Sequence, residues 1–494
     1  MTRSRLCETV VGTTLADLLS ARDAVLAADM MELRLDGVAG LDVATALGGR
    51  HLPVVVTCRP TWEGGRFDGA EAERARVLAE ALERGADYVD IEWRALRESA
   101  GAAFTALVSR HPDRVVLSSH DFDGVPHDLD ARVHAMRAVG AGTIKIAVAV
   151  SRLTDTLILR RVAEGGPAVV IGMGEAGLPT RLLPARFGSV WTYAGHAVAP
   201  GQIPAGRMVD EFRFRDVGPA TRIFGIVGSH AGQSFSPVMH NAAFAAAGCD
   251  AVYVPLRPED FADFLAFADA LGCEGASVTI PYKLDALRAA ASADEAAREV
   301  GAANTLRRSA GGWDATNTDV AGFLAPLGRL YPGGMAGVRA AVIGAGGAAR
   351  AVVVALRAAG AGVTVHARRE GQASEVAEAL GVGSGPWPVA PASWDLLVNT
   401  TPLGGAGHRG ESPMPDGSFD GGVVYDLTYG PEPSPLIRDA RVAGCRTLDG
   451  LPMLVAQAER QFAWWTGSAP PAGVMAAAAR RCVGGARAVE FEEA

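Results

Sequence analysis

The chain has 494 residues and a formal net charge of −9, and 49% of its residues are hydrophobic and 20% charged. A globular chain of this length exceeds one core and indicates two or three domains. The negative balance, with Lys and Arg scattered along the chain, excludes the basic surface of a nucleic-acid-binding protein. The six cysteines form no CxxC pair and show no zinc or disulfide spacing, so we expect a reducing compartment and no metal.

The amino-terminal segment leads directly into a strand-like run and shows no signal-peptide pattern. The chain also lacks an uncharged apolar segment of the ~18 residues that a membrane helix needs. We therefore expect a soluble cytoplasmic protein, a monomer or a homodimer, whose partners are small molecules rather than nucleic acids or membranes.

Eight short β-branched runs alternate with helix-like segments in the first part of the chain. The runs are 6–11, 30–36, 53–59, 86–93, 114–122, 143–150, 168–173 and 189–194. Among the spacers, residues 70–84 show helical spacing and end at Gly85, which is a helix C-terminus signal. Eight alternating β and α units predict a (β/α)8 TIM barrel over residues 1–215, with a doubly wound open sheet as the alternative.

Charged and reactive side chains stand at or near the carboxyl ends of these predicted strands. They are Glu32, Arg34, Asp36, Arg59, Asp90, Glu92, His120 and Lys145, with Arg181 and Gln202 in later loops. In a barrel these strand ends meet at one mouth, where active sites lie. Each residue alone has an ordinary explanation, such as a surface ion pair, but the whole set favours one constellation.

Lys145 lies inside the apolar run 143–150 (TIKIAVAV). Its ammonium must be neutral, paired or facing a polar cavity, unless Lys145 is an exposed edge residue. A desolvated lysine can attack a ketone and form a Schiff base, while His120 suits proton transfer near pH 7 and arginines suit a carboxylate. These residues predict imine-assisted proton abstraction from a small anionic keto acid, although an aldolase would use the same groups.

Five motifs in this half follow one another in a characteristic order. They are MELRLD (31–36), TCRPTWEGG (57–65), SSHDF (118–122), Lys145 and APGQ (199–202). Residues 5–212 thereby resemble type I 3-dehydroquinate dehydratase. The resemblance implies dehydration of 3-dehydroquinate to 3-dehydroshikimate, with Lys145 as the Schiff-base lysine and His120 as the general acid/base. The substrate-binding residues that it implies are Glu32, Arg34, Arg59, Glu63, Arg181 and Gln202. Val198 stands where the family commonly has Ser, so we expect weaker substrate binding at that loop.

Residues 216–221 (DVGPAT) are predicted to be a linker, because Gly-Pro stops regular structure and a new strand-like run starts at Ile223. A second domain, 222–330, follows. Ser236 with Pro237 behind it predicts a helix N-cap and first turn, and two hydroxyls at a helix start suit a carboxylate. A plain cap would explain Ser236 but not Ser234.

The run 275–280 (GASVTI) stops at a proline and presents Lys283, and Asn304, Asn317 and Asp319 follow in polar loops. Lysine with aspartate can orient a ketone and pass a proton. Without further context the same pair would be an ordinary surface salt bridge.

A glycine-rich turn, GAGGAAR (344–350), lies between the buried run 340–343 and a predicted helix over 351–359. This placement is typical of a dinucleotide-binding site in a Rossmann domain, which we place at 331–445. NAD sites usually carry an acidic residue after the next strand, whereas this chain has Arg368 and Arg369, which predict NADP (NADPH). The cofactor-binding residues expected here are Gly344, Ala345, Gly346, Gly347, Ala348, Arg368, Arg369 and Thr400.

The second half carries a further series of motifs. They are SFSP (234–237), VTIPYK (278–283), GAAN (301–304), NTD (317–319), GAGGAAR (344–350), DLTY (426–429) and MLVAQ (453–457). Residues 222–485 thereby resemble shikimate dehydrogenase, which implies that Lys283 and Asp319 form the catalytic pair. The shikimate-binding residues that it implies are Ser234, Ser236, Thr279, Lys283, Asn304, Asp319, Tyr429 and Gln457. Two departures from the family are the loop 228–233 (GSHAGQ) and Ala367, which replaces an Asn before the cofactor arginine. We expect helices in 446–494 to pack back on the substrate domain.

The two resemblances together predict a bifunctional enzyme that dehydrates 3-dehydroquinate and reduces the product to shikimate with NADPH. One alternative is a catabolic quinate/shikimate dehydrogenase fusion, which Arg368 and Arg369 disfavour. The other is a ligand-sensing regulator that kept both folds without the chemistry. The presence of His120, Lys145 and the Lys283–Asp319 pair argues against that regulator.

Overall fold

The structure is a computed structural model that describes residues 3–98, 100–195, 201–405, 407–414, 419 and 422–484. The chain divides into two compact units, Met1–Thr221 with Val254–Gly272, and Arg222–Tyr253 with Cys273–Ala494. Within the described ranges, no helix is long and apolar enough to cross a membrane.

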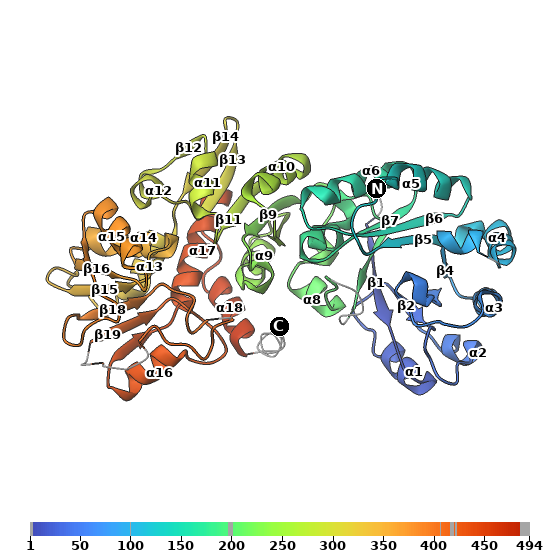
Figure 1. The fold of residues 1–494 in the computed structure, drawn as a ribbon, viewed down its shortest axis with the longest axis horizontal. Helices are drawn as coiled ribbons and strands as arrows, with labels where there is room; N and C mark the ends of the chain where they lie inside the picture. The colour runs from blue at the N-terminus through green and yellow to red at the C-terminus, as the bar shows by residue number, and fades with distance from the viewer. Residues whose placement is uncertain are drawn as a thin grey trace. The chain divides into compact units, whose positions relative to one another are not determined.

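The first unit contains a parallel sheet whose strands pair in chain order (Figure 1). Its strands are β1 (Arg5–Val10), β2 (Met30–Arg34), β3 (Val54–Thr57), β4 (Tyr88–Glu92), β5 (Val115–Asp121), β6 (Thr143–Ala149), β7 (Ala168–Met173) and β8 (Trp191–Ala194). β1 pairs in parallel with both β2 and β8, and a bridge from Ala168 to Ser189 connects β7 to the segment before β8. The sheet therefore closes, which confirms the barrel and excludes the open sheet. The run predicted at 30–36 extends past its strand because its polar end belongs to a loop at the barrel mouth.

One helix follows each strand of the barrel. They are α1 (Leu15–Asp23), α2 (Val43–Leu47), α3 (Glu71–Glu83), α4 (Gly101–Arg110), α5 (Leu129–Ala138), α6 (Leu157–Glu164), α7 (Leu178–Leu182) and α8 (Ala205–Asp210); α10 (Phe261–Leu271) also falls in this unit. The predicted helix over 70–84 is α3, and Gly85 follows it with φ of 87°, a conformation that glycine adopts readily. Buried side chains from seven of the strands, including Cys7, Val55 and Trp191, form one cluster. The barrel is a packed core rather than a pore.

Two further sheets follow the barrel in the chain, and all but the Val254–Leu256 end of β10 belongs to the second unit. The sheet of order β10-β9-β11-β13-β14-β12 consists of β9 (Arg222–Val227), β10 (Ala251–Leu256), β11 (Cys273–Val278), β12 (Ser292–Ala293), β13 (Thr305–Ser309) and β14 (Gly312–Thr316). The parallel sheet of order β17-β16-β15-β18-β19-β20 consists of β15 (Arg339–Ile343), β16 (Gly362–His366), β17 (Gly383–Gly385), β18 (Leu396–Asn399), β19 (Val423–Asp426) and β20 (Arg446–Leu448). The order of the second sheet reverses between β15 and β18, which is where doubly wound folds bind ligands.

Helices of the second unit surround these sheets (Figure 1). They are α9 (Ser236–Ala246), α11 (Lys283–Ala289), α12 (Glu295–Val300), α13 (Asp319–Leu327), α14 (Gly347–Ala358), α15 (Glu370–Leu380), α16 (Pro435–Val442), α17 (Leu451–Thr466) and α18 (Val474–Gly484). α17 and α18 share a buried apolar cluster with α9 through residues such as Phe244, Phe462 and Met475. Trp465 lies in the same cluster, and its indole N–H donates to Leu306 O at 2.9 Å.

Two predicted helix starts are wrong. Ser236 is the first residue of α9 and not its N-cap, which is Phe235 without a side-chain cap bond. The Ser236 backbone N–H donates to Ser234 Oγ at 3.1 Å, so the serine two residues earlier satisfies this group. α14 begins at Gly347 instead of 351, because the second half of the glycine-rich turn is already helical.

Candidate active sites

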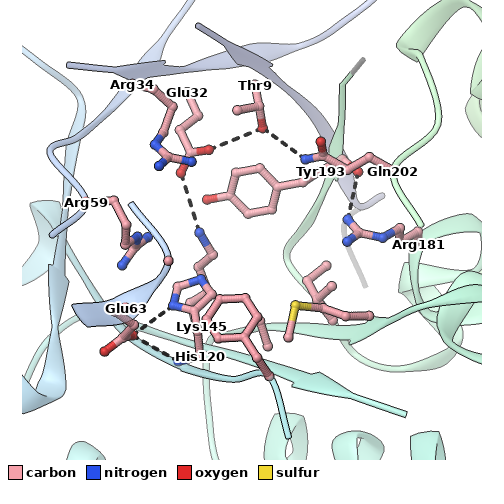
Figure 2. A pocket seen from close by; sticks show the side chains of 15 residues that line it. Thr9, Glu32, Arg34, Arg59, Glu63, His120, Lys145, Arg181, Tyr193 and Gln202 are labelled. Atoms are coloured by element: carbon pink, nitrogen blue, oxygen red, sulfur yellow. Dashed lines mark hydrogen bonds and ion pairs between the residues drawn. The ribbon is translucent and has the colours of Figure 1, made fainter. Parts of the chain in front are cut away.

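A pocket lies at the carboxyl ends of the barrel strands (Figure 2). It is lined by Thr9, Glu32, Arg34, Arg59, Glu63, Gly64, His120, Phe122, Lys145, Ala147, Ile171, Met173, Arg181, Tyr193 and Gln202. All eight barrel residues expected at a site are therefore brought together. They meet although they are distant in sequence, because the parallel strands of a closed barrel end at the same mouth.

Lys145 lies within β6, and its side chain points into the pocket (Figure 2). Its Nζ is 3.4 Å from Glu32 Oε1 and 3.2 Å from Asp90 Oδ2. The same atom lies 4.3 Å from the centroid of the Tyr193 ring. Two carboxylates thus pair the buried ammonium, as its apolar surroundings require. An exposed edge position is excluded because β6 pairs with both β5 and β7.

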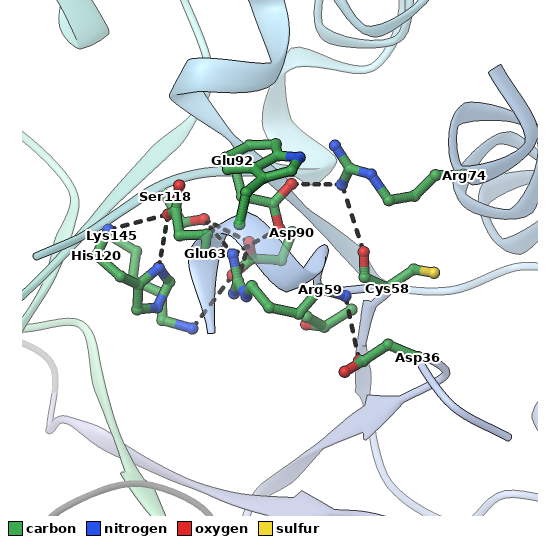
Figure 3. Close-up of polar contacts among 12 residues, drawn as sticks. Asp36, Cys58, Arg59, Glu63, Arg74, Asp90, Glu92, Ser118, His120 and Lys145 are labelled. Atoms are coloured by element: carbon green, nitrogen blue, oxygen red, sulfur yellow. Dashed lines mark hydrogen bonds and ion pairs between the residues drawn. The ribbon is translucent and has the colours of Figure 1, made fainter. Parts of the chain in front are cut away.

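Asp90 connects the lysine to the arginine side of the site (Figure 3). Arg59 Nη2 lies 3.0 Å from Asp90 Oδ1, and Ser118 Oγ donates to the same oxygen at 2.6 Å. Burial alone would raise the pKa of Asp90, but Arg59 and then Lys145 lower this pKa below its usual range. Asp90 therefore stays ionised between the two cations.

His120, near the end of β5, is oriented by Glu63 from the short helix η1 (Thr61–Glu63). Glu63 Oε1 accepts the His120 backbone N–H at 3.0 Å and lies 2.9 Å from ring Nδ1. This arrangement leaves Nε2 as the ring nitrogen available to a bound molecule. Burial, then Arg59 and Lys145, lowers the pKa of His120 well below its usual 6.5, so its imidazole is neutral at pH 7 and can accept a proton.

The Glu63 carboxyl predicts how the stability of the folded chain changes with pH, because burial raises the pKa of Glu63 from 4.5 to about 8. The folded chain therefore holds a proton that the unfolded chain releases near pH 4.5. The stability from this proton is fully present below that pH and is lost as pH rises through about 8. We expect Glu63→Gln, which cannot ionise, to gain stability relative to the natural chain between about pH 5 and 8, by up to a few kcal/mol. Thermal unfolding of both proteins across this range tests the prediction, and a pH-independent difference would contradict it.

The remaining pocket residues are suited to an anionic, hydroxylated ligand. Gln202 Nε2 donates to Thr9 Oγ1 at 3.4 Å, and Thr9 Oγ1 donates to Glu32 Oε2 at 3.2 Å. Arg181 is 2% exposed, and burial lowers its pKa to about 10. A buried guanidinium is costly in free energy, and an anionic ligand would offset that cost. Val198, where weaker binding is predicted, lies outside the described residues.

A second group of functional side chains lies in the other unit, around Lys283 and Asp319. Lys283 Nζ donates to Asp319 Oδ2 at 2.6 Å. Asn304 Nδ2 donates to the other carboxylate oxygen at 2.8 Å and to Thr318 Oγ1 at 2.9 Å. Thr318 Oγ1 in turn donates to Gln457 Oε1 at 3.4 Å. With Asp319 and Gln457 both less than a tenth exposed, this is a buried network rather than a surface salt bridge.

The two serines stand at the end of the neighbouring strand. β9 and β11 run parallel and end side by side at Val227 and Val278. A Cβ at Gly228 would lie 2.2 Å from Thr279 Cγ2, so the loop toward Ser234 starts against Thr279. Ser234 Oγ donates to Ser236 Oγ at 3.1 Å. The ring of Phe235, between the serines, lies 5.2 Å from that of Tyr429.

The glycine-rich turn fits a dinucleotide. Gly344 has φ of 120°, and a Cβ there would lie 2.2 Å from Thr400 Oγ1, so only glycine fits at this position. α14 begins without a side-chain cap and without an acidic residue in its first turn, as a phosphate-binding helix start requires. A Cβ at Gly347 would lie 3.2 Å from Lys283 Cδ, which places the turn beside the side chain of Lys283. Arg368, exposed after β16, is placed where a 2′-phosphate is bound in such folds.

Comparison with known proteins covers both halves of the chain. The family model described as type I 3-dehydroquinase matches residues 6–219, and that of the shikimate dehydrogenase substrate binding domain matches 226–306. The shikimate 5'-dehydrogenase C-terminal domain matches 450–480. The bifunctional 3-dehydroquinate dehydratase/shikimate dehydrogenase of Arabidopsis thaliana, a chloroplastic protein, is 33% identical over 479 residues, which span 90% of this chain and 79% of the relative. The chain belongs to this bifunctional family.

Other relatives of this dehydratase/dehydrogenase match its second half. The shikimate dehydrogenase (NADP(+)) of an Anaeromyxobacter species is 41% identical over 272 residues, 52% of this chain and 95% of that protein. A crystal structure of shikimate dehydrogenase from Aquifex aeolicus has a TM-score of 0.50 and 30% identity, and it covers 53% of this chain and 99% of its own.

Some residues around the two sites of this dehydratase/dehydrogenase were not assigned from the sequence. Thr9 stands in register with Glu32 on adjacent strands, and its place at the end of β1 could have indicated it. Tyr193 likewise lies near the carboxyl end of a barrel strand, β8, and this position could have indicated it. Thr318 lies between two motif residues that were assigned, but only the folded chain shows that it joins Asn304 to Gln457.

Proposed function

We propose that the chain catalyses two consecutive reactions: dehydration of 3-dehydroquinate to 3-dehydroshikimate in the barrel, and NADPH-dependent reduction of that product to shikimate in the second unit. The observation that carries the proposal is the placement of Lys145 between two carboxylates in a pocket that it shares with His120. Supplying 3-dehydroquinate with NADPH and following the loss of nicotinamide absorbance tests both reactions together. No loss with 3-dehydroquinate, or none with 3-dehydroshikimate, would reject the corresponding half.

In the proposed dehydration, Lys145 Nζ gives up one proton and attacks the substrate ketone; a proton returns as water leaves, which forms the positively charged, protonated imine. The imine withdraws electrons from the adjacent carbon, and His120 Nε2 removes a proton there. Hydroxide then leaves with a proton returned by His120, and water releases the product from the lysine. Asp90 stabilises the positive charge of the imine, because it stays ionised beside Lys145.

The proposed binding roles follow from the charges that line the pocket. Arg34, Arg59 and Arg181 are the cations suited to the substrate carboxylate, and Glu32 and Gln202 are suited to its hydroxyls. Glu63 holds His120 in orientation through the Nδ1 and backbone contacts. Thr9 supports both Glu32 and Gln202.

In the proposed reduction, Ser234 and Ser236 bind the substrate carboxylate, and Thr279, Tyr429 and Gln457 surround the ring. The Lys283 ammonium donates to the ketone oxygen and passes it a proton, and Asp319 orients that ammonium through the 2.6 Å contact. Asn304 holds the other oxygen of Asp319. Bound NADPH supplies the hydride. Its pyrophosphate would lie on Gly344–Ala348, and its 2′-phosphate on Arg368 and Arg369, with Thr400 closing the turn.

The preference for NADPH or NADH distinguishes a biosynthetic shikimate dehydrogenase from a catabolic quinate/shikimate dehydrogenase. We expect kcat/KM with NADPH to exceed that with NADH by at least about tenfold, because two guanidinium groups follow β16 in place of an acidic residue. Replacing Arg368 with Ala should remove most of this preference by raising KM for NADPH and leaving KM for NADH unchanged. Comparable kcat/KM for the two cofactors in the natural chain would contradict the assignment.

The proposed domain boundaries keep the barrel at 1–215, the linker at 216–221, the substrate domain at 222–330 and the Rossmann domain at 331–445, followed by helices in 446–494. The monomeric or homodimeric state and the cytoplasmic location stay predictions from the sequence.

A further inference from the structure

Arg74 on α3 is a charged residue that lies entirely out of solvent behind the barrel pocket (Figure 3). Its exposed fraction is 0%, although it belongs to an outer helix of the barrel. The guanidinium carbon lies 4.6 Å from the centroid of the Phe104 ring, which covers one face of it. Such a site for arginine is costly in free energy unless every N–H has a specific acceptor.

One acceptor of Arg74 is Glu92, a fully buried carboxylate that also contacts the pocket residue Arg59. Arg74 Nη1 donates to Glu92 Oε2, while Arg59 Nη1 donates to Glu92 Oε1 at 2.6 Å (Figure 3). Each oxygen of the carboxylate therefore binds one arginine. Arg59 lines the pocket, whereas Arg74 does not. Glu92 thus transmits the position of Arg74 to a pocket residue.

A second branch leads from Arg74 to the loop of Glu63. Arg74 Nη2 donates to Glu71 Oε2 at 2.6 Å, and its Nε donates to the same oxygen at 3.0 Å. The other oxygen, Glu71 Oε1, accepts the indole N–H of Trp62 at 3.2 Å. Trp62 directly precedes Glu63, the residue that orients His120. Arg74 therefore reaches both the arginine side and the histidine side of the pocket.

We propose that Arg74 is a positioning residue for the dehydration reaction, acting on Arg59 through Glu92 and on the Glu63 loop through Glu71 and Trp62. The proposal rests on the dehydratase function proposed above. It adds Arg74, a helix residue that does not line the pocket, to the residues that support dehydration.

The charges around Glu92 predict how the pH–rate profile shifts when Arg74 is replaced. Burial raises the pKa of Glu92, and Arg59 and Arg74 oppose this rise. Without Arg74, a higher pH is needed to keep Glu92 ionised, and an un-ionised Glu92 holds Arg59 Nη1 less firmly, although Asp90 still pairs with Nη2. The acid limb of the pH–rate profile should therefore move to higher pH.

The test compares Arg74→Met with Arg22→Met in the full chain. Arg22 is a matched control because it is a buried arginine of the same barrel, on α1, whose Nη1 donates to Ala46 O and Gly48 O at 2.8 and 2.7 Å. It does not line the pocket. We expect Arg74→Met to lower the dehydratase kcat/KM at least about tenfold, mainly through KM, and to shift the acid limb upward. Arg22→Met should keep the natural KM and pH profile.

Three outcomes bear on the proposal separately. Equal KM and equal acid limbs for the two variants would overturn it, whatever their stabilities. If Arg74→Met does not fold, Arg74→Lys replaces it. Arg74→Lys keeps the charge but cannot make the same set of contacts, so it should raise KM while leaving the acid limb unchanged. A natural KM in Arg74→Lys would then overturn the proposal. Absence of dehydratase activity in the natural chain would instead reject the proposed function.

Discussion

Replacing Lys145 with Met is expected to lower the dehydratase kcat by at least about 1,000-fold and to leave shikimate dehydrogenase activity unchanged. The substitution keeps a chain of similar length but removes the amine that forms the covalent bond, so the electron-withdrawing imine cannot form. The neighbouring carboxylates, Glu32 and Asp90, stay in place and cannot substitute for a nucleophilic nitrogen. Dehydration is measured by the ultraviolet absorbance of the conjugated product, and reduction with 3-dehydroshikimate and NADPH.

The second activity of the chain serves as the folding control for this variant, together with the thermal unfolding of the barrel. Borohydride reduction of the natural chain with 3-dehydroquinate should add mass to the peptide that contains Lys145. Mass on a different lysine, or substantial dehydration by Lys145→Met, would overturn the Schiff-base assignment. A folded variant without borohydride-trapped product would support it.

The second large effect is expected at Lys283, where Met should lower the dehydrogenase kcat by about 100- to 10,000-fold. The ammonium is the proton donor closest to the expected ketone, and Asp319 holds it at 2.6 Å. Loss of the donor leaves the developing alkoxide without stabilisation. Because the glycine-rich turn lies against the aliphatic part of Lys283, which methionine largely retains, KM for NADPH should change little.

Dehydratase activity is the internal control for Lys283→Met. Asn304→Ala offers a matched comparison, because it removes one support of Asp319 and keeps both members of the proposed catalytic pair. Its effect on kcat should therefore be smaller than that of Lys283→Met. Equal losses for the two variants would argue that the whole network, rather than the lysine donor, determines the rate.

Much of the barrel could be predicted because buried parallel strands have a clear chemical signature. Their side chains face apolar surroundings on both sides, so β-branched residues form continuous runs such as 168–173, which matches β7 residue for residue. A polar residue inside such a run is conspicuous, and Lys145 was found in this way. The family resemblance then added roles that composition and spacing alone left open between a dehydratase and an aldolase.

Local geometry at helix starts was less predictable. Ser236 followed by proline is a common N-cap pattern, yet the helix begins at Ser236 itself because Ser234 satisfies its N–H. Several side chains compete for the same backbone donors at such a turn, and the free-energy differences between these arrangements are about 1 kcal/mol. The choice depends on the surrounding chain, which sequence spacing does not contain.

The sequence by itself determined the alternation of strands and helices, the candidate lysines and the glycine-rich turn, because these depend on contacts between residues that are near in sequence. Only the tertiary structure decided which charges meet. Arg74 has charged neighbours on both sides along α3 and would be taken for a solvent-exposed helix residue, yet the fold places it against Glu92, 18 residues away. Burial and pairing of charge depend on how the helix packs on its strand, and this packing makes Arg74 part of the support behind the pocket.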